Sequence, residues 1–497
     1  MSPKPPGDDA RRPRDGRDSG AARNEHDSGG PRDKRDLRES SEARRERRRP
    51  GGPESPPDPV RNIAWRVLNR VELDRAFADR VLHALLAELD LPKRDRAFAT
   101  ELSYGALRMR GRLDSALQQV CTRELSSLEA GVRNLLRLGA YQVMFLERVR
   151  DAAAVDETVT LARANGLGRA AGFINAVLRE LSSRGESLEF PKLATDPVDY
   201  LVEWCSLPRW LAERWLEQFG AEQAAELARN SYLPPPRTVR VSPGADLDQI
   251  ARRLRWRRCE YSPQGITRLE IDPVSDSGFA AGEFSIQDEA AQLIALMVDA
   301  QPNQTVVDCC AAPGGKAVQL AQQVGPRGEV IALELHKHRL GLIRREAERL
   351  RLRNLRVLQR DVAKGFDLQG RLYFPRILVD APCTGLGVLR RNPDARWSIM
   401  PGEIEPIAQR QFDLLDSVAR YVEDDGALVY SVCTLTPEET TGVIDRFCES
   451  HPEFQIEDPR DRLPGTVRKL VDETGALRTL PHRHGCDGFY AVRLVRR

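Results

Sequence analysis

The chain lacks the patterns that define membrane, secreted and disulfide-rich proteins. No stretch approaches the ~18 consecutive apolar residues of a membrane-spanning helix, and the charged N-terminus has no apolar core of a secretory signal. The nine cysteines are odd in number and irregularly spaced, which is typical of reduced thiols and not of a disulfide framework. We therefore expect a cytoplasmic protein with no membrane partner.

The chain also lacks a strong net charge. Residues 1–59 hold 15 Lys and Arg against 13 Asp and Glu, which leaves 61 residues of each sign in the rest of the chain. A site for nucleic acid must therefore be a local basic patch. A metal site is not expected: His482, His484 and Cys486 have no second group of ligands at zinc spacing, and we interpret them as a loop before the last strand.

The length of 497 residues predicts about three domains at ~150 residues each. Residues 1–59 have hardly any aliphatic side chains and should form a disordered charged tail. Residues 60–183 have helical periodicity throughout, which predicts an all-α bundle. In residues 184–283 the apolar pattern predicts linker helices at 208–219 and 221–230, followed by a small β-α-β element.

From residue 284 to 497, apolar strand-like runs alternate with helical patterns. This alternation predicts a mostly parallel sheet with helices on both faces, in which ligands bind at the carboxyl ends of the strands. The polar residues expected at those ends are Asp308, Glu334, Asp361, Asp380 and Cys433. They are the candidates for a functional site.

The stretch VVDCCAAPGGK, residues 306–316, predicts a strand, a tight turn of small residues and a helix. Such a turn lets backbone N–H groups approach a ligand closely. Glu334 lies 20 residues beyond Gly314, the offset at which a carboxylate reaches ribose hydroxyls. Because the turn is not G-x-G-x-x-G, a ligand with adenosine but no diphosphate fits better, and S-adenosylmethionine (SAM) is the leading candidate. Asp361 either accepts from an adenine amine or caps a turn.

Two cysteines follow predicted strands, Cys383 in VDAPCTG and Cys433 in VYSVCTLTPEE. Thr436, Pro437 and Glu439 predict a capping box, so that a helix would begin shortly after Cys433. The positive end of that helix would favour a thiolate suited to nucleophilic catalysis. The alternative is that either cysteine is a small buried hydrophobic residue.

These motifs resemble the RNA cytosine-C5 methyltransferases, the Nol1/Nop2/Sun or RsmB/RsmF family. The matching runs are DCCAAPGGK (308–316), VDAPCTGLGVLRRNPDARW (379–397), SVCTLTPEE (431–439), FSIQDEAAQL (284–293) and HRHGCDGFYAVRL (482–494). The N-terminal runs RNIAWRVLNRVE (61–72) and AGFINAVLRE (171–180) resemble the RNA-binding NusB-like domain. The order of domains is similar to that of the bacterial RsmB-type 16S ribosomal RNA methyltransferases. The resemblance implies a Rossmann-like SAM-binding domain with a terminal antiparallel strand, preceded by a small RNA-recognition-like domain.

The resemblance also implies roles for individual residues. Cys433 would be the nucleophile that adds to C6 of cytosine, Cys383 would help to release the product, and Asp380 would lie between cofactor and base. Glu334 would bind the ribose of SAM and Asp361 its adenine. The methionine end of SAM would lie against Cys310, Ala311, Ala312, Pro313, Gly314, Gly315 and Lys316.

Three arginines beside Cys383, namely Arg390, Arg391 and Arg396, are candidate phosphate contacts. Surface or ion-paired arginines are the alternative interpretation. Val432, Thr440, Ala317 and Glu334 depart from the family pattern without removing a reacting group. We therefore expect a monomeric methyltransferase acting on small-subunit ribosomal RNA, unassembled or partly assembled. The alternatives are a transfer-RNA substrate and a noncatalytic RNA-binding or ribosome-assembly factor.

Overall fold

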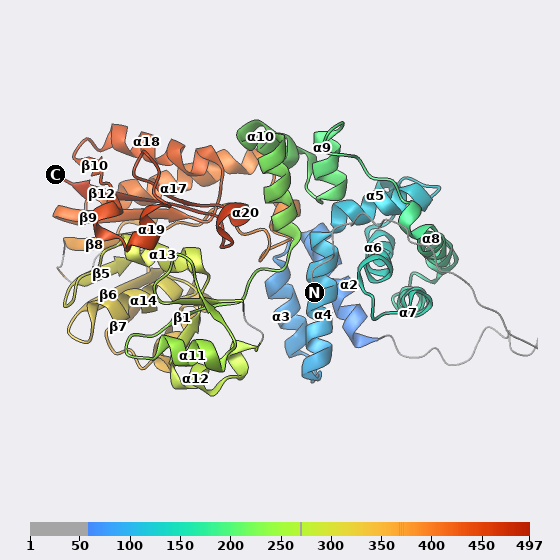
Figure 1. Cartoon of the computed structure of the whole chain (residues 1–497), viewed down its shortest axis with the longest axis horizontal. Helices are drawn as coiled ribbons and strands as arrows, with labels where there is room; N and C mark the ends of the chain where they lie inside the picture. The colour runs from blue at the N-terminus through green and yellow to red at the C-terminus, as the bar shows by residue number, and fades with distance from the viewer. Residues whose placement is uncertain (1–57, 269–270, 367, 369, 371) are drawn as a thin grey trace, which may run out of the picture.

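The computed structural model describes residues 58–497 except 269–270, 367, 369 and 371 (Figure 1). The expected charged tail, residues 1–59, lies outside the described residues apart from its last two positions. Asp58 accepts a hydrogen bond from the Val60 N–H and so caps the first described helix. Among the described residues, no helix is both long and apolar enough to cross a membrane.

The predicted helical bundle is present between residues 59 and 184. Its helices pack around a continuous aliphatic core in which Leu102, Leu135 and Ile174 are fully buried. In Figure 1 the bundle forms the blue and teal half of the molecule. The helices are α2 (Pro59–Asp74), α3 (Ala78–Ala87), α4 (Lys93–Arg108), α5 (Arg110–Val120), α6 (Ala130–Phe145), α7 (Asp151–Ala164) and α8 (Ala171–Arg184).

A connecting region joins the bundle to the rest of the chain. It contains the short α9 (Pro197–Asp199) and the long α10 (Arg209–Tyr232). Inside α10, Gly220 has φ 74° and ψ 168°, a conformation that breaks the helix. The helix pair predicted on either side of residue 220 is therefore present as two halves that meet at this glycine. Trp215 on the first half is buried against Leu386 and Leu389 of the C-terminal domain.

The small domain is an antiparallel sheet in the order β2-β3-β1-β4, partnered by two short helices. Val239, Ile266 and Phe284 from the sheet pack on Ile250 and Leu254. Because β4 pairs with β1, this sheet extends past the predicted domain boundary at residue 283. The elements are β1 (Thr238–Val241), α11 (Leu247–Arg253), β2 (Arg257–Arg258), β3 (Gly265–Thr267), α12 (Ser277–Ala281) and β4 (Phe284–Ile286).

The C-terminal domain has the predicted Rossmann-like sheet, in the order β10-β12-β9-β8-β5-β6-β7 with β11 paired to β12. Strands β5 to β9 run parallel to one another. The terminal strand β12 runs antiparallel to β9, as the family resemblance implies. The strands are β5 (Thr305–Asp308), β6 (Glu329–Glu334), β7 (Leu355–Gln359), β8 (Phe374–Asp380), β9 (Val422–Val432), β10 (Phe454–Ile456), β11 (Leu477–Thr479) and β12 (Phe489–Arg496).

Helices cover both faces of this sheet because consecutive strand residues are apolar and point to opposite sides. Val306 packs on the face that carries α13 and α14, whereas Val307 packs on the face that carries α17 and α18. Ile343 of α15 joins the first face through Ala332. The helices are α13 (Glu289–Met297), α14 (Gly315–Val324), α15 (Lys337–Arg349), α17 (Ile404–Ala419) and α18 (Thr441–Ser450).

The strand order changes direction between β5 and β8. The chain proceeds from β5 outward to β6 and β7, then returns to the other side of β5 as β8. Ligand sites in open α/β sheets lie at such a point, outside the carboxyl ends of the strands. The turn after β5 and the residues that follow β8 and β9 meet there.

The bundle contacts the C-terminal domain through residues 389–403, the segment after Cys383. Asp394 accepts a hydrogen bond from the Ala78 N–H (3.2 Å), the first residue of α3, and so supplies a cap that α3 lacks on its own. The Trp397 indole donates to the Leu107 carbonyl at 2.8 Å. These contacts tie the end of α4 and the start of α3 to the C-terminal domain.

Candidate active site

The turn after β5 has the predicted conformation. The chain leaves β5 at Asp308 and enters α14 at Gly315. Gly314 has φ 119°, and a Cβ atom there would lie 3.1 Å from the Ile343 Cα of α15. The position therefore requires glycine for both its backbone angle and its close packing. The turn leaves the start of α14 open to a small ligand.

Asp308 is a buried carboxylate to which sequence reasoning assigned a strand end but no function. Its side chain is 1% exposed, and neither oxygen has a hydrogen-bond partner of normal geometry among the described residues. Burial raises its pKa to about 7, the nearby Asp380 adds to the shift, and Lys316 opposes it. A buried acid without a partner suits a positively charged group of a ligand.

Lys316 and Asp380 form an ion pair across the point where the strand order changes. The Lys316 Nζ donates to one Asp380 oxygen at 2.7 Å, and the Ser431 hydroxyl donates to the other at 2.7 Å. Burial alone would lower the pKa of Lys316, but the Asp380 carboxylate outweighs it and the pKa is raised. The ion pair and the Ser431 hydroxyl therefore fix the orientation of Asp380 from two sides.

Two predicted ribose and adenine contacts follow β6 and β7. Glu334 is 4% exposed and accepts from the His336 N–H at 2.9 Å, with Arg339 3.5 Å from its second oxygen. Asp361 comes shortly after β7 and lies 3.3 Å from Lys364. Both carboxylates retain acceptor sites beyond these contacts. Their roles toward a ligand stay predictions.

The two candidate cysteines are in contact. The Cys383 Sγ lies 3.3 Å from the Cys433 Sγ, and both thiols are free. The hydrogen bond to Cys433, burial, and the negative charges of Cys433 and Glu439 raise the pKa of Cys383 well above its ordinary value. Cys433 follows β9 by one residue, and the neighbouring strand β8 ends at Asp380. Sequence positions 50 residues apart thus converge on one point.

Backbone contacts hold the loops that carry these cysteines. We call residues 381–391 the Cys383 loop and residues 433–440 the Cys433 loop. The Gly387 N–H donates to the Cys433 carbonyl at 3.0 Å, and the Gly488 N–H donates to the Gly387 carbonyl at 2.9 Å. A Cβ atom on Gly387 would lie 2.3 Å from the Gly488 oxygen, so this approach depends on glycine.

The predicted capping box after Cys433 is wrong. Pro437–Glu439 is a 3-10 turn, the Thr436 side chain makes no cap hydrogen bond, and α18 begins only at Thr441. The Thr436 hydroxyl instead donates to the Glu439 carboxylate, which is fully buried. Thr436 is thus the N-cap residue and Pro437 the first residue of a 3-10 turn, as predicted, but the α-helix begins only at Thr441.

The three arginines predicted as phosphate contacts have partners within the protein. Arg390 and Arg396 are buried, whereas the Arg391 side chain is 32% exposed and its phosphate contact stays a prediction. Arg390 is 4% exposed and pairs with Asp487 at 3.1 Å, whereas Arg391 pairs with Asp288 at 2.6 Å. Arg396 is fully buried, and its guanidinium donates to backbone carbonyls, including that of Ser231 at 2.9 Å. Arg390 and Arg391 therefore match the alternative interpretation, that of ion-paired arginines. Arg396 instead links three parts of the chain.

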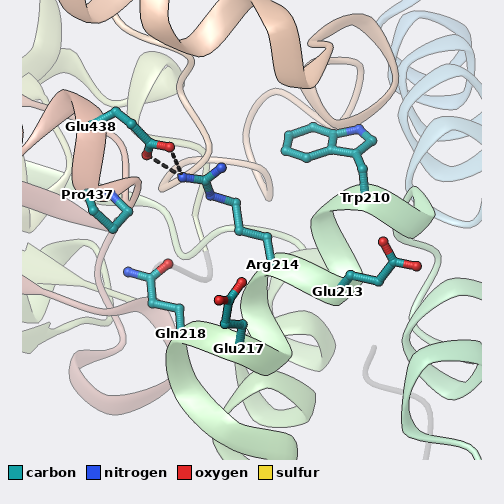
Figure 2. A pocket seen from close by; sticks show the side chains of 7 residues that line it. All are labelled: Trp210, Glu213, Arg214, Glu217, Gln218, Pro437 and Glu438. Carbon is teal, nitrogen blue, oxygen red and sulfur yellow. Dashed lines mark hydrogen bonds and ion pairs between the residues drawn. The ribbon is translucent and has the colours of Figure 1, made fainter.

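A hollow of about 650 Å³ lies on the outer side of the Cys433 loop, against the first half of α10. Figure 2 shows Arg214 of α10 reaching across it to the Glu438 carboxylate, with Trp210 at its rim. Gln218, one turn further along α10, donates to the Leu435 carbonyl at 2.8 Å. Helix α10 thus supports the Cys433 loop from outside.

The two histidines and the cysteine before the last strand, where no metal site is expected, have other surroundings. His482 contacts the Gln223 side chain, and His484 accepts from the Leu480 N–H within the short α20 (Pro481–His484). Cys486 is buried. Over the described part of the chain, no group of three His, Cys, Asp or Glu side chains is arranged to hold a metal ion.

Comparisons with known proteins cover both halves of the chain. Residues 295–495 match the family described as 16S rRNA methyltransferase RsmB/F, and residues 58–183 match the NusB family. The chain is 36% identical over 438 residues to the probable ribosomal RNA small subunit methyltransferase B of Bacillus subtilis (strain 168), a match covering 87% of this chain and 97% of that protein.

Solved structures agree on the fold. The crystal structure of PH0851 covers 89% of this chain and 100% of its own, with a TM-score of 0.71 at 23% identity. NSun6 from Pyrococcus horikoshii, solved with SFG, covers 58% of this chain and 98% of its own, with a TM-score of 0.51 at 21% identity. The resemblance drawn from the motifs is confirmed: the chain belongs to the RsmB/F family of 16S rRNA methyltransferases and carries a NusB-family domain before the methyltransferase domain.

Proposed function

We propose that the protein methylates C5 of a cytosine in small-subunit ribosomal RNA, with SAM as methyl donor and Cys433 as the nucleophile. The observation that carries the proposal is the contact of the Cys383 and Cys433 sulfurs, 3.3 Å apart, beside the strand-end carboxylates. The family named for 16S ribosomal RNA and the NusB-family domain support an RNA substrate.

The residues around the turn after β5 fit SAM. Asp308 has a buried carboxylate without a partner, which suits a ligand that carries an ammonium and a sulfonium group. Residues 310–316 would lie along its methionine end, Glu334 would accept from the ribose hydroxyls, and Asp361 would accept from the adenine amine. When bound, SAM supplies an electrophilic methyl group. NSun6 from Pyrococcus horikoshii, which shares this fold, was solved with SFG, and this supports a small-molecule ligand in the fold.

The cysteines act on the base. C5 of cytosine is a poor nucleophile until the Cys433 thiolate adds to C6, which forms an S–C6 bond and gives C5 enamine character. Asp380, fixed by Lys316 and Ser431, supports the adduct by accepting a hydrogen bond from N3 of the ring, which takes up the proton released by Cys433 as the S–C6 bond forms. After C5 is alkylated, a base removes the C5 proton, the C5–C6 double bond reforms and Cys433 leaves as a thiolate.

Cys383 assists this last step because its sulfur touches that of Cys433. The target cytosine must be unstacked or single-stranded to enter, which favours ribosomal RNA that is unassembled or only partly assembled. We propose that the protein acts as a cytoplasmic monomer. We propose domain boundaries near residues 60 and 184, as predicted, and place the third after β4, because β4 pairs with β1 of the small sheet.

The test is transfer of labelled methyl groups from SAM to small-subunit RNA from cells that lack this protein. Wild-type protein should form 5-methylcytosine at one site, and Cys433→Ser should abolish transfer. Cys448→Ser is the matched control, since Cys448 lies on α18 away from both loops. Full activity of Cys433→Ser would reject the assignment of Cys433 as the nucleophile.

Two further outcomes would identify the alternative functions. Methylation of transfer RNA with the ribosomal RNA left unmodified would identify a transfer-RNA enzyme. Binding of SAM and RNA without turnover would identify a noncatalytic factor. Mapping 5-methylcytosine in RNA from cells with and without the gene locates the target nucleotide.

A further inference from the structure

Glu439 is a fully buried carboxylate that lies between the two cysteine loops. From the Cys383 loop, Thr384 donates to it twice, through its N–H at 2.9 Å and its hydroxyl at 2.6 Å. From the Cys433 loop, the Thr436 hydroxyl donates at 2.7 Å and the Thr434 hydroxyl lies at 3.1 Å. The Gln411 amide of α17 donates at 3.0 Å. One side chain therefore receives hydrogen bonds from three segments of the chain.

The partners are immediate neighbours of the reacting sulfurs. Thr384 follows Cys383, and Thr434 follows Cys433. The two threonine hydroxyls also contact each other at 2.8 Å, so the loops touch beside the thiols as well as through the carboxylate. Any shift of the Glu439 carboxylate is transmitted through one residue to each sulfur.

The chemistry of the donors explains why a carboxylate occupies this position. An ionised carboxylate only accepts and offers about four lone-pair sites. Two N–H groups and the hydroxyls of Thr384 and Thr436 occupy them, which leaves the Thr434 hydroxyl free to donate to Thr384. Glu439 forms no ion pair within the described residues, so its hydrogen bonds must compensate its burial. It can do so only while both loops stay in place.

We propose that Glu439 is the positioning residue of the cysteine pair: it holds the Cys383 and Cys433 loops in the arrangement that keeps the two sulfurs in contact. The mechanistic consequence rests on the proposed function, in which Cys383 assists the release of Cys433 from the base. No hydrogen bond joins Glu439 to either sulfur among the described residues. It positions the two sulfurs through Thr384 and Thr434. The pKa of Cys383, raised by its hydrogen bond to Cys433 and by burial, is raised further by the charge of Glu439.

The spacing of the sulfurs can be measured without RNA or SAM. Diamide oxidises two adjacent thiols to a disulfide while its own N=N bond is reduced to a hydrazine. The rate at which full-length protein links Cys383 to Cys433 is read from the joined peptides by mass spectrometry, and Cys383→Ser shows the background. Glu439→Ala should lower the rate at least tenfold. Glu439→Gln, which keeps the acceptor facing Thr384 N–H and Gln411, should stay within threefold of wild type.

Glu438→Gln is the matched control. Glu438 is the preceding residue, but its carboxylate pairs with Arg214 on the outer side of the loop (Figure 2). This variant should link the cysteines at the wild-type rate. If Glu439→Ala does not fold, Glu439→Asp replaces it, since the shorter side chain cannot reach both loops and should also slow the linkage. Linkage at the wild-type rate in the folded Ala or Asp variant overturns the proposal.

Steady-state kinetics supply the second measurement. A misplacement of ~1 Å at reacting groups costs about 100-fold in rate, so Glu439→Ala should lose about that much in kcat while KM for RNA stays unchanged. Glu439→Gln should recover most of the activity. A rise in KM at constant kcat would instead identify an RNA-binding role and overturn the proposal. The diamide result does not depend on methylation, so it holds even if the wild-type protein methylates no cytosine. Failure of the Glu439 proposal can therefore be told apart from failure of the proposed function.

Discussion

The buried Asp308 predicts a specific dependence of stability on pH. Its pKa is about 7 in the folded protein, against an ordinary value of 3.8. Because folding raises the pKa, the folded state holds this proton more tightly than the unfolded state between these values. The stabilisation is fully present below pH 4 and is lost as the pH rises to 7, by about 4 kcal/mol in all, at 1.36 kcal/mol for each unit.

Asp308→Asn isolates this contribution because it keeps the shape of the side chain and removes its titration. Between pH 5 and pH 8, wild-type protein should lose about 3 kcal/mol of unfolding free energy relative to the variant. Urea unfolding of both full-length proteins at each pH gives this difference directly, and other titrating groups cancel in the comparison. If the unfolding free energies of wild type and variant change by the same amount between the two pH values, the raised pKa of Asp308 is refuted.

The same carboxyl should govern binding of SAM, if the proposed function is right. A positively charged ligand favours the ionised form, so affinity for SAM should be about fivefold weaker at pH 6 than at pH 7. Isothermal titration calorimetry measures this. Asp308→Asn should bind more weakly and with no such pH dependence. An unchanged pH profile in the variant would mean that Asp308 does not face the positive groups of the ligand.

Three other substitutions test the site. Cys383→Ser should accumulate a covalent protein–RNA adduct on denaturing gels, and a freely dissociating product would contradict its role in release. Arg396→Met should lower the unfolding free energy by about 3 kcal/mol, because buried carbonyls lose their donor. Its affinity for RNA should stay within twofold of wild type. A loss of RNA affinity without a loss of stability would instead support the interpretation of Arg396 as a phosphate contact. Gly387→Ala should cost about 1–3 kcal/mol through its clash with Gly488 and reduce methyl transfer, whereas Gly402→Ala, with open space around it, should do neither.

The residues at strand ends could be predicted because local pattern determines them. Apolar runs bounded by Asp308 and Asp380 located β5 and β8, and the parallel topology then required their ends to meet. The contact between Cys383 and Cys433 follows from the same rule, since β8 and β9 are neighbours. These predictions needed only strand periodicity and one fact of sheet geometry.

Predictions that depended on tertiary burial failed. The spacing of Thr436 and Glu439 matches a capping box, but the two loops bring more donors to Glu439 than a helix start could offer. Arg396 is fully buried by segments distant in sequence, which no local charge pattern reports. Likewise, β4 follows a helix as a first Rossmann strand would, yet its partner is β1 of the small sheet.

The junction between the bundle and the C-terminal domain has a practical consequence for protein engineering. The Asp394 carboxylate, the Trp397 indole and the Arg396 guanidinium all find partners on or beside the bundle. A truncated fragment that starts after residue 184 would lose the partners of Asp394 and Trp397 on the bundle, whereas Arg396 would keep its bonds to the Ser206 and Ser231 carbonyls. We therefore expect excision of the bundle to expose and loosen the segment that leads out of the Cys383 loop.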